Sequence, residues 1–332
     1  MTGEPREHVD RARAIRLKFR ELLARPDLTI MPGGFSPLCA RMAELAGFES
    51  FFVAGSQMSA WLLGVPDAGI LGLRDVVDHA RHCAARVDIP IFLDCDTGFG
   101  NAANAHFSTL EVIRSGVAGM QIEDQEAPKK SGTSAGRRCV SIEEATGKIR
   151  AAVAARDTLD PAFVVCARCD AIGAEGESFE TALARGVAYA RDGGADLVWL
   201  NSVETLDDLA RFCAGVPAPV LAIWGGGQPE PSFEDYRRTG VKVMLYPVLA
   251  SSAGMQAAWQ TLHDFRARGL DALRDWRASI HAGRVPATDL KTLTGDSIIR
   301  EIEARFTPAD QQRDYAGTRG HAAHSDGGPA RG

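Results

Sequence analysis

Eight short apolar runs alternate with amphipathic segments along most of this chain. The runs begin near Leu28, Ser50, Ile89, Ala118, Phe163, Asp196, Pro219 and Val241. Apolar runs of this length between turn residues are typical of buried strands, and segments between them, such as residues 73–87 and 142–156, have the spacing of amphipathic helices. Because a strand–helix unit repeated in this way closes into a parallel barrel, the sequence predicts an α/β fold, a (β/α)8 TIM-type barrel.

Charged side chains follow three of the predicted strands directly. Asp94 and Asp96 end the third strand, Glu123 ends the fourth and Arg168 ends the fifth. In a parallel barrel these strand ends meet at one face, where active sites are built. The alternative fold, an open doubly wound sheet, would gather such residues at a single switch point, so their spread over several strands favours the barrel.

The pair Asp94 and Asp96 indicates a bound cation. Side chains alternate along a strand, so both carboxylates lie on one face and repel each other unless a proton or cation separates them. Oxygen ligands of this kind suit Mg²⁺. Gly98 and Gly100 then allow a sharp turn. Taken alone, the same pattern also fits a polar strand end followed by a glycine turn.

Composition excludes several classes of partner. The chain has 332 residues, 45% hydrophobic and 24% charged, with a net charge of -6, an ordinary globular balance that argues against nucleic acid. It has no apolar run long enough to span a membrane and no apolar signal region at its start, so we expect a cytoplasmic protein without membrane contact. The seven cysteines show no disulfide spacing. Cys166 and Cys169 form a C-x-x-C, but they should face opposite sides of a strand.

The two ends of the chain differ in pattern from the predicted barrel. We expect a flexible N-terminus at residues 1–10, a barrel with its N-terminal helix at 11–268, extra C-terminal helices at 269–306 and a disordered tail at 307–332. The last helix has apolar residues on one side. A helix outside a closed barrel must bury that side elsewhere, so the sequence predicts a homo-oligomer, a dimer or tetramer.

Two loops carry further candidate residues. Small residues at 55–60, G-S-Q-M-S-A, would let backbone amides approach an anion. The polar, cationic segment at 123–138 is unusually long for a connection between a strand and a helix. Such a segment is typical of a mobile lid, and a solvated basic loop is the alternative.

Taken together, these segments resemble the isocitrate lyase / phosphoenolpyruvate mutase superfamily. The resemblance covers about residues 14–305. It rests on G-S-x-x-S at 55–59, P-D at 66–67, D-C-D-T-G-F-G at 94–100, E-D-Q at 123–125, P-K-K at 128–130, G-R-R at 136–138, G-K-I-R-A-A at 147–152 and A-R-x-D-A at 167–171. It is most similar to the branch of methylisocitrate lyase, dimethylmalate lyase and carboxyphosphonoenolpyruvate mutase. The E-D-Q triplet favours that branch, because phosphoenolpyruvate mutases typically have E-D-K.

The resemblance implies a cofactor and a set of site residues. The cofactor would be Mg²⁺, with Mn²⁺ as the alternative ion, held closest by Asp94, while Asp96 and Glu123 hold its water ligands. The implied substrate contacts are Ser56, Gln57, Asp67, Arg168, Asn201 and Trp224. The implied catalytic residues are Arg168 with Lys129 and Ser131 of the lid. The superfamily also implies a homotetramer that exchanges its C-terminal helices between subunits.

The chain departs from the lyases of the superfamily at the lid and at the far end of the site. Ser131 stands where those lyases have a cysteine acid/base, and Thr133 stands where they have histidine; a serine hydroxyl is a much poorer acid than a thiol. Asn201 replaces a glutamate after the sixth strand. Trp224, between Ile223 and Gly225, stands where they have an asparagine motif. The distal half of the substrate is therefore expected to differ.

The sequence thus predicts a Mg²⁺-dependent lyase that cleaves a C–C bond of a small 2-hydroxy or 2-oxo dicarboxylic acid through an enolate. The substrate could be a substituted malate, a methylisocitrate-like or an oxaloacetate-like acid, with Tyr246, Asp170 and Lys129 as candidates for the missing acid. Phosphonomutase or phosphonopyruvate hydrolase chemistry is the alternative. A non-catalytic, metabolite-binding relative is the second alternative.

Overall fold

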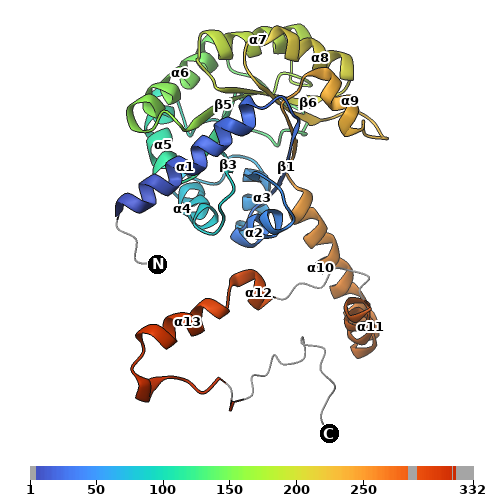
Figure 1. The fold of residues 1–332 in the computed structure, drawn as a ribbon. Coiled ribbons are helices and arrows are strands. Elements are labelled where there is room, and N and C mark those ends of the chain that lie inside the picture. Colours follow the sequence, from blue (N-terminus) through green and yellow to red (C-terminus); the bar gives the residue numbers. More distant parts are fainter. Residues whose placement is uncertain (1–4, 283–289, 316, 319–332) are drawn as a thin grey trace. The chain divides into compact units, whose positions relative to one another are not determined.

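The structure is a computed structural model that describes residues 5–282, 290–315, 317 and 318 (Figure 1). A first compact unit ends at Met255 and a second begins at Gln256, whereas the predicted boundary lay at residue 268. Residues 1–4 and 319–332, within the two predicted terminal segments, lie outside the described residues, so flexibility there stays a prediction.

Eight parallel strands form a closed barrel in the first unit, which confirms the predicted fold. They are β1 (Thr29–Gly34), β2 (Phe51–Val53), β3 (Ile91–Asp94), β4 (Gly119–Glu123), β5 (Val164–Cys169), β6 (Leu197–Val203), β7 (Val220–Trp224) and β8 (Val243–Tyr246). Each strand pairs with the next, and β1 closes on β8 with Thr29 opposite Val243. The strands begin one or two residues after the predicted starts.

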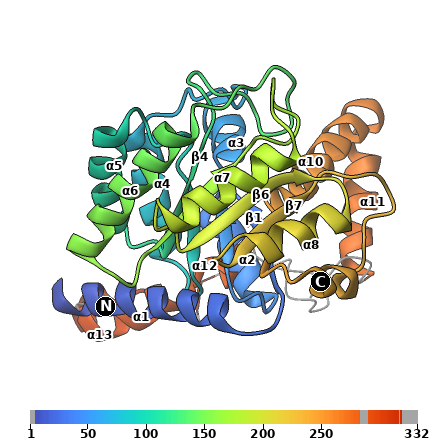
Figure 2. The same cartoon turned by 90° about the horizontal axis from the view of Figure 1, so that it is seen from above.

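Helices surround the strands, and α6 and α7 lie outside β5 and β6 (Figures 1 and 2). They are α2 (Pro37–Leu45), α3 (Gly55–Met58), the π-helix η1 (Ser59–Leu63), α4 (Leu73–Ala84), α5 (Ala102–Arg114), α6 (Ile142–Leu159), α7 (Phe179–Arg191), α8 (Leu206–Gly215) and α9 (Phe233–Thr239). Side chains cap several of these helices: Ser141 accepts a hydrogen bond from the Glu144 amide, and Ser178 from the Thr181 amide. Such caps satisfy backbone donors that a helix start leaves free.

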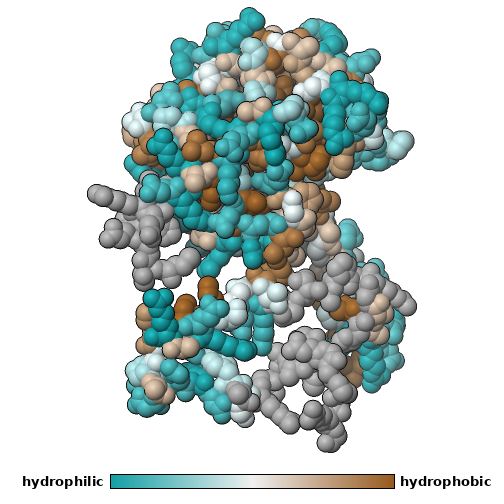
Figure 3. All heavy atoms as spheres, viewed as in Figure 1, coloured by the Kyte–Doolittle hydropathy of each residue, from teal (hydrophilic) through white to brown (hydrophobic). Residues whose placement is uncertain are grey.

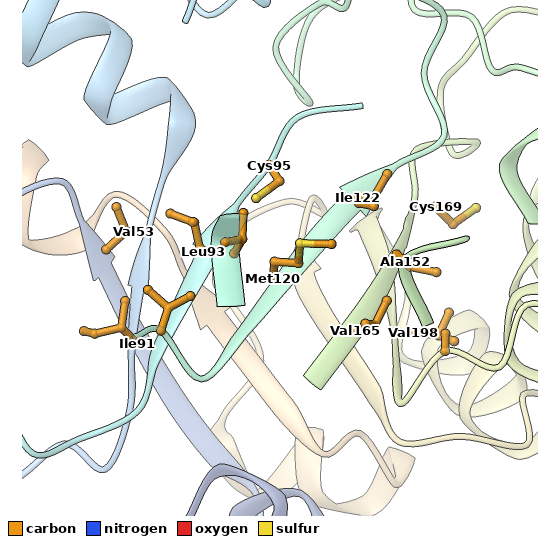
Figure 4. Close-up of a cluster of buried hydrophobic side chains, with 14 of the residues drawn as sticks. Val53, Ile91, Leu93, Cys95, Met120, Ile122, Ala152, Val165, Cys169 and Val198 are labelled. Carbon is orange, nitrogen blue, oxygen red and sulfur yellow. The ribbon is translucent and has the colours of Figure 1, made fainter. Parts of the chain in front are cut away.

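The buried apolar side chains form two layers, because strand residues alternate between the barrel interior and the helices. Figure 4 shows part of the outer layer, including Leu93, Met120 and Val165. The inner layer includes Phe52 and Trp199, whose rings meet edge to face at 5.5 Å. Cys166 belongs to the inner layer and Cys169 to the outer, so the prediction that they face opposite sides is confirmed.

Helix α1 (Pro5–Ala24) closes the amino end of the barrel. Its Phe19 is fully buried in the inner layer, with its ring 5.7 Å from that of Phe92. Its Arg16 is also buried and pairs with Asp160 at 2.6 Å. Arg16 therefore faces inward, whereas Arg13 and Lys18 of the same helix are exposed.

Within the described part of the chain, four helices follow the barrel: α10 (Leu249–Arg268), α11 (Leu270–His281), α12 (Leu290–Thr294) and α13 (Ser297–Phe306), with a short 3₁₀ helix, η2 (Ala309–Gln311), after them. Large apolar side chains are exposed on these helices and reach the surface in Figure 3. Among the described helices, none is both long enough and apolar enough to cross a membrane. An exchange of helices between subunits is not tested by a single chain and stays a prediction.

Candidate active site at the carboxyl ends of the strands

Asp94 ends β3 and is held in one orientation by three donors. Its Oδ2 accepts a hydrogen bond from the Gly55 amide at 2.9 Å, and its Oδ1 accepts one from the Asp96 amide at 3.1 Å. The side-chain amide of Gln121 also donates to Oδ1. A β-carbon at position 55 would lie 3.0 Å from Asp94 Oδ2, so glycine allows this close approach of the backbone.

The lid (residues 123–138) brings a buried cation into this acidic end of the barrel. The Lys129 ammonium lies 2.6 Å from Asp96 Oδ1, 2.7 Å from Asp67 Oδ1 and 3.7 Å from Glu123 Oε1. Only 3% of Lys129 is exposed. Burying so many charges is tolerated because they neutralise one another. Four residues that the sequence predicted as site residues therefore meet in space.

Burial and neighbouring charges shift the pKa values of the carboxyls in different directions. Burial raises the pKa of Asp96 to about 6, although the Lys129 ammonium opposes the rise. Burial also raises the pKa of Glu123 well above its ordinary value. For Asp94, burial raises the pKa, but the charges of Lys129 and Arg168 outweigh burial and lower it overall. Asp94 is therefore the carboxyl of the three that ionises most readily.

Arg168 extends from β5 into the same site. Its guanidinium lies 3.1 Å from Glu123 Oε2 and donates to Asp170 Oδ1 at 2.9 Å. The group also stacks over the Trp199 ring, 4.5 Å from the ring centroid. Burial alone would lower the pKa of Arg168, but Asp170 and Glu123 raise it overall. The arginine is thus a fixed, dry positive charge at the barrel mouth, suited to a developing anion.

The chemistry of the donor set fits hydrated Mg²⁺. Both carboxylate oxygens of Glu123 are buried without a hydrogen-bond partner, although Lys129 and Arg168 lie nearby. Together with Asp94 and Asp96 they offer only oxygen donors, which Mg²⁺ prefers. Over the described ranges, no three His, Cys, Asp or Glu side chains already form a ligand cluster. The fit of Mg²⁺ to these carboxylates therefore rests on the chemistry and the charge of their oxygen atoms.

The middle of the lid rests on Arg168. The Gly132 carbonyl accepts a hydrogen bond from Asn201 Nδ2 at 2.9 Å. A β-carbon on Gly132 would lie 2.1 Å from a guanidinium nitrogen of Arg168 and 3.0 Å from Asn201 Nδ2, so the backbone touches both side chains. Ser131 directly precedes this contact, and its catalytic role stays a prediction.

The other predicted substrate residues have mixed surroundings. Ser56 and Gln57 begin α3 beside Asp94 and are half-buried. Trp224 packs against the outer layer, with its ring 6.0 Å from that of Tyr236, and donates from its indole nitrogen to the Gly227 carbonyl. Its neighbour Ile223 packs against the inner layer instead. A direct contact of Trp224 with substrate stays a prediction that this placement does not favour.

The sequence patterns did not single out two side chains that support the site, the amide of Gln121 and the carboxylate of Asp124. Gln121 lies two residues before Glu123, so strand alternation would have placed it on the same face. Asp124, on the opposite face, accepts from the Tyr189 hydroxyl at 2.6 Å and from the Asp170 amide at 2.8 Å. Burial raises the pKa of Asp124, and the charge of Asp170 adds to the rise. By accepting a hydrogen bond from the Asp170 amide, Asp124 fixes the backbone just after β5.

Comparison with known families agrees with this architecture. The family model described as phosphoenolpyruvate phosphomutase matches residues 19–266. The chain belongs to this family. The relatives it resembles include the 2,3-dimethylmalate lyase of Eubacterium barkeri, 33% identical over 87% of this chain and 97% of that protein. The 2-methylisocitrate lyase of Aeropyrum pernix is 34% identical over 76% of this chain and 80% of that protein. The predicted superfamily is confirmed, and these named relatives are carbon–carbon lyases.

Solved structures of the family include two with other chemistry. An oxaloacetate acetylhydrolase in complex with 3,3-difluorooxalacetate has a TM-score of 0.76 and 30% identity, and the match covers 87% of this chain and 95% of that one. A phosphonopyruvate hydrolase in complex with oxalate and Mg²⁺ has a TM-score of 0.77 and 31% identity, with 88% of this chain and 99% of that chain covered. Structures named for oxaloacetate hydrolysis and for phosphonopyruvate hydrolysis are thus both similar to this chain.

Proposed function

We propose that this chain is a Mg²⁺-dependent lyase that cleaves a C–C bond of a small 2-hydroxy or 2-oxo dicarboxylic acid, with an oxaloacetate-like acid as the favoured substrate. The observation that carries the proposal is the buried Arg168 guanidinium, 3.1 Å from Glu123, at the same barrel mouth where Asp94 ends β3. A fixed cation beside an all-oxygen acidic cluster is suited to hold a 2-oxo acid and stabilise its enolate.

The proposed mechanism assigns a role to each part of the site. Asp94 would hold Mg²⁺, with Asp96 and Glu123 holding its water ligands; Mn²⁺ is the alternative ion. When bound, the ion supplies Lewis-acid stabilisation of negative charge on substrate oxygens. Arg168 binds the oxygen on which charge develops. Ser56 and Gln57, which with Asp67 are the predicted substrate contacts, orient the carboxylate, and the closed lid excludes water until the enolate is protonated.

The acid that protonates the enolate decides which substrate fits. The hydroxyl of Ser131 is a weak acid. The carboxylates around Lys129 raise its pKa, so it releases a proton less readily than a free lysine. Burial and a hydrogen bond to Glu230 also raise the pKa of Tyr246. Asp170 is occupied by Arg168 and Asn201. These surroundings favour a reaction that needs no strong acid on the lid.

Cleavage of an oxaloacetate-type acid meets this requirement. In decarboxylation, the bond to the distal carboxylate breaks, carbon dioxide leaves, and the electron pair passes into the 2-oxo group as an enolate, which water protonates once the lid opens. In hydrolytic cleavage, water adds to the 2-oxo carbon, the bond from that carbon to the methylene carbon breaks, and oxalate and acetate leave, with the proton lost by the water adduct taken up by the methylene carbon. The similarity to an oxaloacetate acetylhydrolase structure supports this substrate class.

Phosphorus–carbon chemistry is the second candidate. A phosphonomutase or phosphonopyruvate hydrolase uses the same acidic cluster and arginine, and a lid serine is no obstacle to it. The similarity to a phosphonopyruvate hydrolase that binds oxalate and Mg²⁺ supports this reading. A non-catalytic metabolite-binding role would require the acidic cluster to be retained without chemistry.

We also propose a cytoplasmic location and a homo-oligomeric assembly.

A turnover screen followed by NMR tests the proposal. The purified chain would be mixed with Mg²⁺ and, separately, with oxaloacetate, methylisocitrate, dimethylmalate and phosphonopyruvate. Pyruvate or oxalate appearing from oxaloacetate, and lost on addition of EDTA, is the expected result. Phosphate from phosphonopyruvate would move the assignment to the second candidate. If Asp94→Ala left every turnover and the thermal stability unchanged, both enzymatic proposals would fail.

A further inference from the structure

Asp170 anchors a hydrogen-bond network that reaches the lid on both sides of Ser131. On one side, the Lys130 amide donates to Gln125 Oε1 at 3.0 Å. The other end of the same side chain, Gln125 Nε2, donates to Asp170 Oδ2 at 3.2 Å. Gln125 thus connects the residue just before Ser131 to the end of β5.

On the other side of Ser131, Asn201 makes the matching connection. Its Nδ2 donates to the Gly132 carbonyl at 2.9 Å and to Asp170 Oδ1 at 2.5 Å. An amide nitrogen has two hydrogens, and these two acceptors use both. Asn201 thus links the residue just after Ser131 to the same carboxylate.

The network is dry and charged. Asp170 is fully buried, and Gln125 and Asn201 are 1% and 3% exposed. Arg168 completes it by donating to Asp170 Oδ1 at 2.9 Å. In a dry site a hydrogen bond to a charged group is strong, and a donor or acceptor left without a partner is costly. The network therefore has one well-defined arrangement, with the lid closed.

We propose that Gln125, Asp170 and Asn201 form a lid clamp: positioning residues that fix Ser131 over the active site and hold the lid shut. The part concerning Ser131 rests on the proposed function; the part concerning the lid does not. The clamp also gives a physical role to the asparagine at 201. A glutamate there would set a second carboxylate against Asp170, whereas an amide donates to it. With both hydrogens engaged, the amide nitrogen of Asn201 is not free to bind a distal substrate carboxylate, which suits a short substrate.

Isosteric substitutions test the clamp. Asn201→Asp and Gln125→Glu keep the shape of each side chain but replace the donor that faces Asp170 by an acceptor. Limited trypsin digestion then reports lid opening, because cleavage after Lys129 or Lys130 requires the lid to leave the barrel mouth. We expect initial cleavage at these sites, located by mass spectrometry, to be at least about tenfold faster in both variants, since a lost buried contact to a charged group corresponds to that ratio or more.

The matched control is Asn104→Asp at the start of α5. This amide accepts a hydrogen bond from the Asn101 backbone through an oxygen that aspartate retains, and it contacts no lid residue in the described bonds. The variant should be cut at the wild-type rate. If an acidic variant of the clamp fails to fold, Asn201→Ala and Gln125→Met remove the donors without adding charge and should show the same faster cleavage.

Three outcomes separate the clamp from the proposed function. Faster lid cleavage supports a positioning role if the factor by which kcat falls is at least about ten times the factor by which KM changes. KM changes little when only the reacting geometry is lost. Wild-type cleavage rates in both acidic variants, at unchanged melting temperature, overturn the clamp whether or not a substrate is found. An inert wild type with a loosened lid in the variants would overturn the proposed function and leave the lid clamp supported.

Discussion

At the scale of single residues, opposite charges placed at fixed separations make this site possible. Lys129 touches Asp67 and Asp96, while Arg168 lies against Glu123 and Asp170. The two cations thus offset the charge of these four carboxylates, whereas Asp94 is held by hydrogen bonds from Gly55, Asp96 and Gln121. Strand position was enough to predict Asp94, Glu123 and Arg168, which lie at or next to the last residue of a barrel strand, whereas Asp96 follows the end of β3 with a φ of 47° and is not part of the strand. The contact between Asn201 and the lid depends on the course of the lid in space, so residue spacing could not predict it.

The missing lid acid yields the prediction that belongs at this scale. Combining Ser131→Cys with Thr133→His restores the lid pair of the lyases that the chain resembles. If the acid is the main difference, methylisocitrate or dimethylmalate cleavage should rise at least about tenfold, within the range that general acid catalysis contributes. Pyruvate or succinate release would be followed by NMR. No gain would mean that the far end of the site, around Asn201, has been rebuilt for another molecule.

At the scale of elements, the lid shows where sequence reasoning ends. Its length and glycines indicated a functional loop between β4 and α6. They gave no sign that Gly132 would touch Arg168, because such a contact depends on the three-dimensional course of the loop. Trp224 illustrates the same limit: the start of β7 was predicted to within one residue, but the tryptophan packs against the outer layer while Ile223 packs against the inner one.

A pair of glycine substitutions tests the lid contact. Gly132→Ala introduces a β-carbon 2.1 Å from Arg168, so the lid cannot close without displacing the arginine. We expect turnover to fall by about a hundredfold, as misplacement of about an ångström does in other sites, with little change in melting temperature. Gly147→Ala in α6 is the control, since nothing lies within 4 Å of its β-carbon position. It should keep full activity and gain about 0.5–1 kcal/mol of stability.

At the scale of the whole molecule, helix α1 seals the barrel through a buried arginine. Arg16 pairs with Asp160 at 2.6 Å and also donates to the backbone carbonyls of Val117 and Ile113. The sequence predicted the number and order of the strands well, because their alternation with helices is a local pattern. It could not show that Arg16, near the start of the chain, would pair with Asp160, near the middle of the chain.

Arg16→Met tests how much the seal contributes. The substitution keeps a long apolar side chain but leaves Asp160 buried without its cation, which costs about 3–5 kcal/mol of unfolding free energy. Arg13→Met on the exposed side of α1 is the control and should change stability by less than about 0.5 kcal/mol. Denaturant unfolding followed by fluorescence measures both. Equal stability of the two variants would show that Arg16 is dispensable for closing the barrel.

The apolar helices after the barrel give the last prediction, that the chain associates with further copies of itself. On α10, Trp259 and Leu262 are 65% and 67% exposed, and on α13 Phe306 is 67% exposed. Side chains of this size in helical spacing are rarely left in water, and a second copy offers the same faces in return. Light scattering coupled to size exclusion should therefore show a dimer or tetramer. Leu262→Asp should shift it towards the monomer, whereas Ala257→Asp, on the opposite side of α10, should leave it unchanged. A wild-type monomer at micromolar concentration would contradict the prediction, and identical masses for both variants would place the contact away from α10.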